Sequence, residues 1–220
     1  LDNQHICGAV VINENFALTA AHCVDFAGYP ASRFSVVCGA HDILNPNEGH
    51  WQTAVASNIV MHESYDGNAN GFPNDIAVIR LATPLTLSAT CQAAELPQDT
   101  TKTYSGKLST ITGWGRGGAA AQYLKEAPIT VISYNDCRSR WGIFFNPIRS
   151  SHICVFNSGT YGACNGDSGG PLVSPDYDTG KTTVTGVTSF GRSGCDTSYP
   201  SVYTRISSYT SWITNTMNSM

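Results

Sequence analysis

Eight cysteines constrain this chain of 220 residues more than any other feature of its sequence. Their number is even, and no two of them show the C-x-x-C spacing that is typical of zinc sites and redox motifs. Free thiols buried in a cytosolic protein are one alternative. We prefer four disulfides in an extracellular protein, because bridges persist in oxidising compartments. The cysteines are Cys7, Cys23, Cys38, Cys91, Cys137, Cys154, Cys164 and Cys195.

Short runs of β-branched and aromatic residues, separated by turn residues, predict an all-β fold. This pattern is typical of a sandwich or of a pair of barrels. A helical period appears near the C-terminus, over residues 209–217, with Ser207 and Ser208 as candidate caps, and a shorter helix is expected at 135–141. The expected strands are 7–12, 16–19, 34–38, 53–61, 75–81, 108–114, 129–132, 152–156, 182–190 and 201–206.

The composition argues against several classes of function. Charged residues make up 13% and hydrophobic residues 41% of the chain, as in soluble globular proteins. The net charge is −4 and no run of lysine or arginine occurs, which argues against nucleic acid and anionic membranes as partners. The apolar runs are too short to span a bilayer. No signal peptide opens the sequence, which is expected of a mature secreted form.

Three short motifs contain residues with catalytic potential. The loop GACNGDSGGP at 162–171 places Ser168 directly after an acid and between glycines. The motif TAAHC at 19–23 contains His22, and NDIAVIRL at 74–81 places Asp75 before an apolar run. Each motif alone is weak evidence, because lone histidines, turn aspartates and loop serines are common without any catalytic role.

Together these motifs resemble those of the chymotrypsin-like (trypsin-fold) serine peptidases, in which His, Asp and Ser follow in this order. The resemblance covers nearly the whole chain. It implies two Greek-key six-stranded β-barrels with a C-terminal α-helix. Residues 1–105 would form the N-terminal barrel, and residues 106–220 the C-terminal barrel with the primary pocket, as one peptidase domain. The weaker markers are CGA at 7–9, TGWG at 112–115, PSVY at 200–203 and WI at 212–213.

The resemblance gives each motif a role in a Ser-His-Asp triad. A serine hydroxyl is a poor nucleophile at neutral pH, so Ser168 needs His22 as a base to take its proton. Asp75 would hold the imidazole in the required tautomer and stabilise its charged form. The backbone N–H groups of Gly166 and Ser168 are the implied donors to the oxyanion of the tetrahedral intermediate.

Asp167 has a different implied role. In the family this acid pairs with the ammonium group of a new N-terminus, usually Ile-Val-Gly-Gly, and the pair orders the oxyanion loop. The sequence begins instead with Leu1-Asp2-Asn3. It is an incomplete record of the mature protein, or the segment is a separate chain, or activation differs, and we favour the first. Without a partner, a buried Asp167 would be costly.

The primary pocket is expected to be open, uncharged and largely apolar. Gly162 stands at its base, where trypsin-like members carry Asp, and Ser201 adds a hydroxyl where many relatives carry Gly. We expect Phe, Tyr, Leu or Met before the scissile bond, because burial of each contributes about 1.5–3 kcal/mol; a broad preference is the alternative. The implied substrate-binding residues are Gly162, Asn165, Ser189, Phe190, Gly191 and Ser201, with Arg192 at the rim.

The resemblance also implies how the cysteines pair. It joins Cys7 to Cys23, Cys137 to Cys154 and Cys164 to Cys195, and leaves Cys38 and Cys91 to pair within the first barrel. A further bridge of the family is expected to be absent, since Ser109 and Ser174 occupy both of its positions.

Within the family, GACNGDSGGPL and YPSVYTR look most like invertebrate members, including the annelid fibrinolytic proteases called lumbrokinases. This suggests protein digestion in a gut, with fibrin as a substrate. We expect a secreted monomer that meets protein inhibitors and needs no cofactor or metal. Ala40 stands where calcium-binding relatives carry an acid. The remaining histidines are interpreted as surface residues: His5, His41, His50, His62 and His152.

Two alternatives to an active endopeptidase follow from the same residues. The first is a catalytically silent, protease-like binding protein, or a zymogen-like form that lacks the N-terminal clamp. The second is an esterase that uses the same triad. Its GxSxG motif would precede the Asp and the His, and the order of His22, Asp75 and Ser168 is the reverse.

Overall fold

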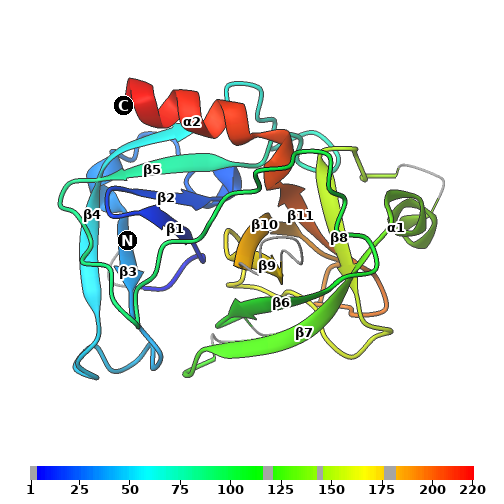
Figure 1. The fold of residues 1–220 in the computed structure, drawn as a ribbon, viewed down its shortest axis with the longest axis horizontal. Helices are drawn as coiled ribbons and strands as arrows, with labels where there is room; N and C mark the ends of the chain where they lie inside the picture. Colours follow the sequence, from blue (N-terminus) through cyan, green and yellow to red (C-terminus); the bar gives the residue numbers. More distant parts are fainter. Residues whose placement is uncertain (1–3, 116–120, 143–145, 176–181) are drawn as a thin grey trace.

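The computed structural model describes residues 4–115, 121–142, 146–175 and 182–220. The strands form two antiparallel groups that lie side by side (Figure 1). Short 3₁₀ turns occur at Ala21–Cys23, Ala31–Arg33 and Ile206–Ser208. The helices and strands are β1 (Val10–Asn13), β2 (Phe16–Thr19), β3 (Ser35–Cys38), β4 (Gln52–Met61), β5 (Ala77–Leu81), β6 (Leu108–Gly113), β7 (Lys125–Ile132), α1 (Tyr134–Trp141), β8 (His152–Phe156), β9 (Pro171–Pro175), β10 (Thr182–Phe190), β11 (Ser201–Arg205) and α2 (Thr210–Ser219).

The first group is a five-stranded sheet in the order β1-β2-β5-β4-β3. In β4, Ala54 and Ala56 are buried while Val55 between them is exposed, as expected of a strand with one face on the core. The backbone N–H of Ala94 donates to the carbonyl of Val11 at 2.8 Å, so an irregular segment continues the hydrogen bonding beside β1. The core of this group contains Ala17, Phe34, Val36, Ile79 and Leu81.

The second group is a closed barrel of six strands in the order β10-β11-β8-β7-β6-β9. Its core contains Ile129, Val155 and Leu172, which are at most 1% exposed. In β10, Gly186 has no side chain where β11 approaches, since a Cβ there would lie 2.8 Å from Cβ of Tyr203. The two strand groups and the C-terminal helix confirm the fold class that the sequence predicts, whereas the boundary at 105/106 stays a prediction.

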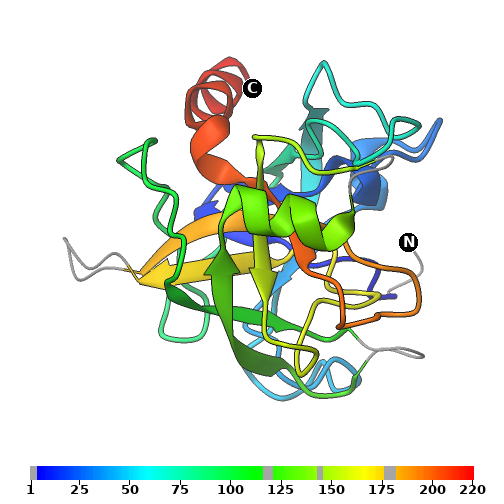
Figure 2. The same cartoon turned by 90° about the vertical axis from the view of Figure 1, so that its right-hand side faces the viewer.

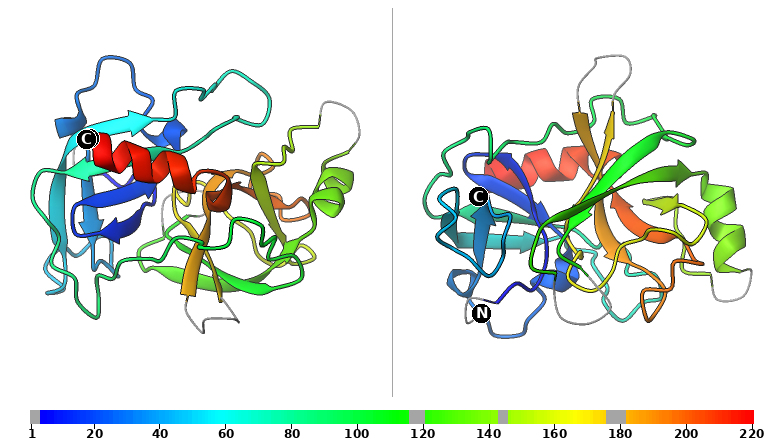
Figure 3. Two further views of the ribbon diagram at one scale, coloured as in Figure 1. Left: turned by 45° about the horizontal axis from the view of Figure 1, so that its top comes forward. Right: turned by 90° about the horizontal axis from the view of Figure 1, so that it is seen from below.

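Helix α2 packs the end of the chain onto the first strand group (Figures 1 and 3). Ile213 of α2 is fully buried in a cluster with Leu18 and Val78 of the first group and with Val184 of the second. The expected serine caps are wrong: Ser207 and Ser208 lie in the preceding 3₁₀ turn, and the N-cap residue of α2 is Tyr209, without a side-chain capping bond. The helix therefore depends on packing rather than on a polar cap.

Helix α1 lies on the outside of the second barrel (Figure 2). The side chain of Ser133 caps it by accepting a hydrogen bond from the N–H of Asp136 at 3.1 Å. Asp136 lies in its first turn, and Arg138 and Arg140 lie in its last, an arrangement that complements the helix dipole. The short helix expected at 135–141 is confirmed, and it begins one residue earlier.

One strand was not predicted. Strand β9 pairs with β10 and with β6 and so closes the second barrel. Pro171 and Pro175 are its first and last residues, and prolines are signals that lower the expectation of a strand.

Four disulfides join all eight cysteines, in the pairs that the resemblance implies. They are Cys7–Cys23, Cys38–Cys91, Cys137–Cys154 and Cys164–Cys195. At the two positions where the resemblance implies that a bridge is replaced by serines, the buried hydroxyls of Ser109 and Ser174 lie 2.8 Å apart, and Ser174 also contacts the hydroxyl of Thr185 at 2.8 Å. A hydroxyl network therefore joins β6, β9 and β10.

This geometry predicts that the double variant Ser109→Cys/Ser174→Cys forms a fifth disulfide. The two positions are 65 residues apart in sequence. A bridge that closes so long a loop is expected to raise the free energy of unfolding by about 2–4 kcal/mol. Thermal unfolding of the variant with and without reductant measures the gain. The variant Ser109→Ala/Ser174→Ala serves as the control, and equal stability of the oxidised and reduced double-cysteine forms would contradict the prediction.

Candidate active site

The carboxylate of Asp75 is fully buried, two residues before β5, between the two strand groups. Its Oδ2 accepts hydrogen bonds from Nδ1 of His22 at 2.8 Å and from the hydroxyl of Ser189 at 2.6 Å. The Oδ1 atom of Asp75 accepts the backbone N–H of His22 at 3.0 Å. The backbone carbonyl of Asp75 accepts the hydroxyl of Thr204 at 2.7 Å. These donors compensate the cost of burying the charge.

His22 lies in the 3₁₀ turn directly after β2, and its side chain is 27% exposed. A carboxylate can only accept, so Nδ1 must carry the proton in the bond to Asp75. In the neutral imidazole, Nε2 then keeps a free lone pair. This tautomer can act as a base toward a hydroxyl placed on the open side of the ring.

The loop that carries Ser168 is held between the two strand groups. The backbone N–H of Gly8 donates to the carbonyl of Ser168 at 2.7 Å, and the N–H of Gly169 donates to the carbonyl of Thr188 at 2.8 Å. Gly169 has a φ of +78°, and a Cβ on it would lie 2.2 Å from the hydroxyl oxygen of Thr19. Only glycine fits here, which explains one glycine of the motif.

These contacts bring Ser168 beside the segment that leads from β2 to His22. A Cβ on Gly169 would also lie 3.2 Å from the N atom of Ala20, two residues before His22. Among the residues that the structure describes, no hydrogen bond joins the Ser168 hydroxyl to His22. Such bonds are often long in enzymes without substrate and shorten in the complex.

His5 was interpreted as a surface residue, and the structure corrects this. Its Nε2 lies 2.9 Å from the carbonyl oxygen of Gly166, to which it donates, since a carbonyl can only accept. Its ring packs edge-on against Trp114. Gly166 has a φ of +96°, so this contact fixes a peptide in a conformation that favours glycine. No local pattern around His5 indicated this contact.

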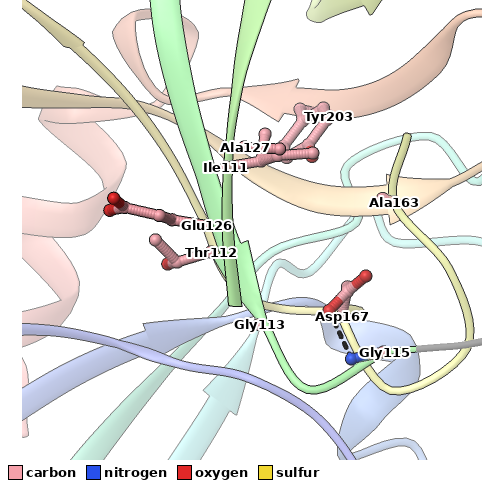
Figure 4. A pocket seen from close by; sticks show the side chains of 9 residues that line it. All are labelled: Ile111, Thr112, Gly113, Gly115, Glu126, Ala127, Ala163, Asp167 and Tyr203. Carbon is pink, nitrogen blue, oxygen red and sulfur yellow. Dashed lines mark hydrogen bonds between the residues drawn. The ribbon is translucent and has the colours of Figure 1, made fainter. Parts of the chain in front are cut away.

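The side chain of Asp167 lines a small cavity of about 60 Å³ (Figure 4). One carboxylate oxygen accepts the N–H of Gly115 at 2.8 Å, and the other accepts the N–H of Cys164 at 2.8 Å. A Cβ on Gly113 or Gly115 would lie within 2.5 Å of these oxygens. Burial raises the pKa of Asp167, and the two backbone donors oppose the shift. The cavity is lined by Ile111, Thr112, Gly113, Gly115, Glu126, Ala127, Ala163, Asp167 and Tyr203.

The residues expected at the base of the substrate pocket lie together. A Cβ on Gly162 would be 3.0 Å from the hydroxyl oxygen of Ser201, which accepts the N–H of Ala163 at 2.9 Å. Thr197 also lies here, although the sequence did not indicate it as a pocket residue. Its methyl group would be 3.3 Å from a Cβ on Gly162. The disulfide between Cys164 and Cys195 joins the two segments.

The other predicted pocket residues occupy two environments. Ser189 is buried, and its hydroxyl donates to the carboxylate that also binds His22. Phe190 is half-buried among aromatic rings, whereas Gly191 and Asn165 are exposed. The bond from Ser189 to Asp75 joins residues 114 positions apart, and no sequence spacing could have indicated it.

His152, the second corrected histidine, is only 3% exposed. Its Nδ1 accepts the N–H of Arg149 at 3.1 Å, and its ring packs edge-on against Phe190. Within the described residues its Nε2 has no hydrogen-bond partner. Burial, and then the positive charge of Arg149, lower the pKa of His152 to about 4, although the negative charge of Asp75 opposes them. His152 is therefore a neutral core residue behind the pocket wall at neutral pH.

The described part of the chain offers one group of three potential metal ligands, formed by Cys7, His22 and Cys23. The two cysteines are joined in a disulfide, so this group does not make a metal site.

The loop that includes Ala40 is organised by Glu48, whose carboxylate accepts the backbone N–H groups of His41 and Asp42. In the same described residues, no helix has the length and apolar character needed to cross a membrane.

Comparison with known proteins decides the family. The trypsin family model, described as "Trypsin", matches residues 1–213. The chain belongs to the trypsin family. It is 39% identical to fibrinolytic enzyme, isozyme C, of Lumbricus rubellus, over 96% of this chain and 88% of that protein. It is 39% identical to chymotrypsin-like elastase family member 1 of the dog, over 98% and 82%.

Two further proteins are similar to this chain, one in sequence and one in structure. Brachyurin of Leptuca pugilator is 38% identical over 97% of this chain and 88% of that protein. The structure of mouse neuropsin, a serine protease expressed in the limbic system, superposes with a TM-score of 0.83 and 29% identity, over 99% of this chain and 91% of that chain. This trypsin-family chain is a serine endopeptidase that acts on proteins, and its disulfides fit an extracellular location.

The burial of His152 predicts a specific pH dependence of stability. The pKa of His152 is about 4 in the folded protein and has the ordinary value of 6.5 in the unfolded chain. As the pH falls, His152 is therefore protonated in the unfolded chain before it is protonated in the folded protein. The stability due to neutral His152 is complete above about pH 6.5, and about 3 kcal/mol is lost between there and pH 4. Denaturant unfolding at several pH values should show this slope in the wild type and a weaker one in His152→Gln.

The exposed His50 provides the matched control. His50→Gln is expected to follow the wild-type profile, since that side chain is open to solvent. Equal slopes in wild type and His152→Gln would contradict the assignment.

Proposed function

We propose that His22, Asp75 and Ser168 form the catalytic triad of this endopeptidase. The observation that carries the proposal is the 2.8 Å bond between Nδ1 of His22 and the buried carboxylate of Asp75, beside the Ser168 loop. This bond selects the tautomer in which Nε2 can take the proton of the Ser168 hydroxyl. The carboxylate also stabilises the imidazolium that this transfer produces.

The reaction then follows in two halves. The oxygen of Ser168 attacks the substrate carbonyl carbon, and the carbonyl oxygen becomes an oxyanion that accepts the N–H groups of Gly166 and Ser168. As the C–N bond breaks, His22 gives its proton to the departing amine and an acyl ester remains on Ser168. A water molecule, deprotonated by His22, hydrolyses this ester and restores the hydroxyl. Each oxyanion donor is expected to contribute about 3 kcal/mol.

We further propose a preference for a large apolar residue before the scissile bond. Gly162 at the pocket base and Ser201 opposite it bring no charge, which disfavours Lys and Arg. Phe, Tyr, Leu and Met gain most from burial in such a pocket. A broad preference is the alternative, since Gly191 leaves the mouth open. Asn165 adds a polar group at the rim.

The likeness to an earthworm fibrinolytic enzyme supports digestion of extracellular proteins, with fibrin as one substrate and a gut lumen as the setting. Action as a monomer, restrained by protein inhibitors, belongs to the same proposal.

Ser168→Ala tests the nucleophile. The rate constant kcat is expected to fall by about 10⁵–10⁶-fold, because the attacking oxygen is lost. Intact mass after treatment with a fluorophosphonate should show one adduct on the wild type and none on Ser168→Ala. The adduct-forming protein should cleave peptides with Phe, Tyr, Leu or Met before the bond.

Ser150→Ala is the control for this experiment, because Ser150 is exposed. It should retain both the adduct and the cleavage. Absence of an adduct on folded wild-type protein would overturn the proposed activity and leave the catalytically silent or zymogen-like alternative.

We also propose that Asp167 pairs with an α-ammonium group that enters the cavity of Figure 4. The cavity combines the half-buried carboxylate of Asp167 with the apolar side chains of Ile111, Ala127 and Ala163, which suits an ammonium that bears a branched aliphatic side chain. A cation there would offset the cost of the buried charge. The pair would hold the Gly166 peptide in the conformation needed for the oxyanion hole.

Asp167→Asn is expected to lower kcat/KM by more than about 100-fold, since one half of a buried ion pair is lost. The free energy of unfolding at pH 7 measures the pair directly. With an ammonium partner the variant is destabilised. Without one the destabilisation should be smaller, because burial already disfavours the charged form of Asp167 and the variant loses only the acceptor of one backbone N–H. Unchanged activity in a stable variant would contradict the role.

A further inference from the structure

A continuous series of rings runs outward from the proposed triad. The ring of Phe72 lies 6.1 Å from the imidazole of His22 and 5.9 Å from the ring of Phe190. Trp141 of α1 packs edge-on against Phe190 at 5.5 Å and lies 5.6 Å from Tyr199. All four aromatic residues are half-buried, so each shows part of its surface to solvent. These rings form a partly exposed apolar surface that begins at the reacting groups.

A cation ends this series. The guanidinium of Arg192 lies 4.9 Å from the centre of the Tyr199 ring, and Arg192 is exposed. A guanidinium that lies over a ring keeps its N–H donors in its own plane, where they can bind a carboxylate. The stacking therefore limits the freedom of the side chain and leaves its donors open to a ligand.

The position of Arg192 along the chain gives its distance from the chemistry. Ser189, at the end of β10, donates to Asp75, and Arg192 follows three residues later. Extended chain advances about 3.3 Å per residue, so the Cα atom of Arg192 lies no more than about 10 Å from that of Ser189. An extended substrate that starts at Ser168 and follows this segment brings its third or fourth residue before the scissile bond to the guanidinium.

The charges around Arg192 leave it available for a ligand. Asp196 is the acid in electrostatic contact with it: Arg192 helps to lower the pKa of Asp196, although hydrogen bonds from Ser198 are the larger cause. One carboxylate oxygen of Asp196 already accepts the N–H and the hydroxyl of Ser198, at 3.0 and 2.6 Å. Arg149 adds positive charge near Phe72, and its guanidinium is bound to the carbonyl of Asn70 at 3.0 Å.

We propose that Arg192 is a specificity-determining residue that selects an acidic side chain three or four residues before the scissile bond. The ring surface binds the intervening apolar part of the substrate, and the guanidinium pairs with the carboxylate at its end. This inference rests on the proposed peptidase activity, because it concerns the acyl side of the same substrate.

The test compares peptides that differ only in Glu or Gln at each of these two positions. For the wild type at low salt, kcat/KM is expected to be about 3–5-fold higher with Glu at the selected position, as for an exposed ion pair. The advantage should shrink as salt is added. It should disappear in Arg192→Gln, and Arg192→Glu should favour Lys over Gln at that position.

The control is Arg138→Gln, because Arg138 stacks on Tyr134 of α1 and is exposed. It removes the same charge and should keep the full preference for Glu. Equal Glu and Gln rates in active wild type would overturn the proposal, and so would a preference that survives in Arg192→Gln. A loss of cleavage of every peptide would instead count against the peptidase activity, and fluorophosphonate labelling separates the two results.

Discussion

The carboxylate of Asp75 joins the two halves of the molecule. It accepts both the ring and the backbone N–H of His22 from the first strand group, and the hydroxyl of Ser189 from β10 of the second. Its own carbonyl accepts the hydroxyl of Thr204 from β11. A fully buried carboxylate is costly unless such donors are present, so docking of the two groups and assembly of the site stabilise each other. The tautomer of His22 follows from the same contacts.

Asp167 is a second carboxylate held by hydrogen-bond donors, and it has fewer of them than Asp75. Its carboxylate accepts two backbone N–H groups, and burial still raises its pKa. The oxygens of Asp167 leave no room for a side chain at Gly113 or Gly115. His5 binds the carbonyl of Gly166, the residue before Asp167. Asp75 thus orients His22, whereas Asp167 is bonded to Gly115 and to Cys164 at the start of the Ser168 loop. Within the described chain the carboxylate of Asp75 accepts three hydrogen bonds, and that of Asp167 accepts two.

The sequence predicted the elements with clear periods and the residues with clear motifs. It missed β9, because Pro171 and Pro175 bound it, and it misplaced the cap of α2, because Tyr209 begins that helix by packing. It could not indicate that His5 binds Gly166 or that His152 is buried against Phe190, since these partners lie far away in sequence. A single histidine has no pattern that separates surface from core.

Three of the four disulfides join segments around the site, whereas Cys38–Cys91 ties the end of β3 to the core of the first strand group. Cys23 follows His22 directly, and its partner Cys7 precedes Gly8, which binds the Ser168 loop. Cys164 and Cys195 join the two segments of the pocket, and Cys137–Cys154 fixes α1, which carries Trp141, to β8. Inside the second barrel, the hydroxyls of Ser109, Ser174 and Thr185 suffice, because packed strands already fix their positions. Three of the four covalent bonds thus lie where loops near the site must keep side chains in place.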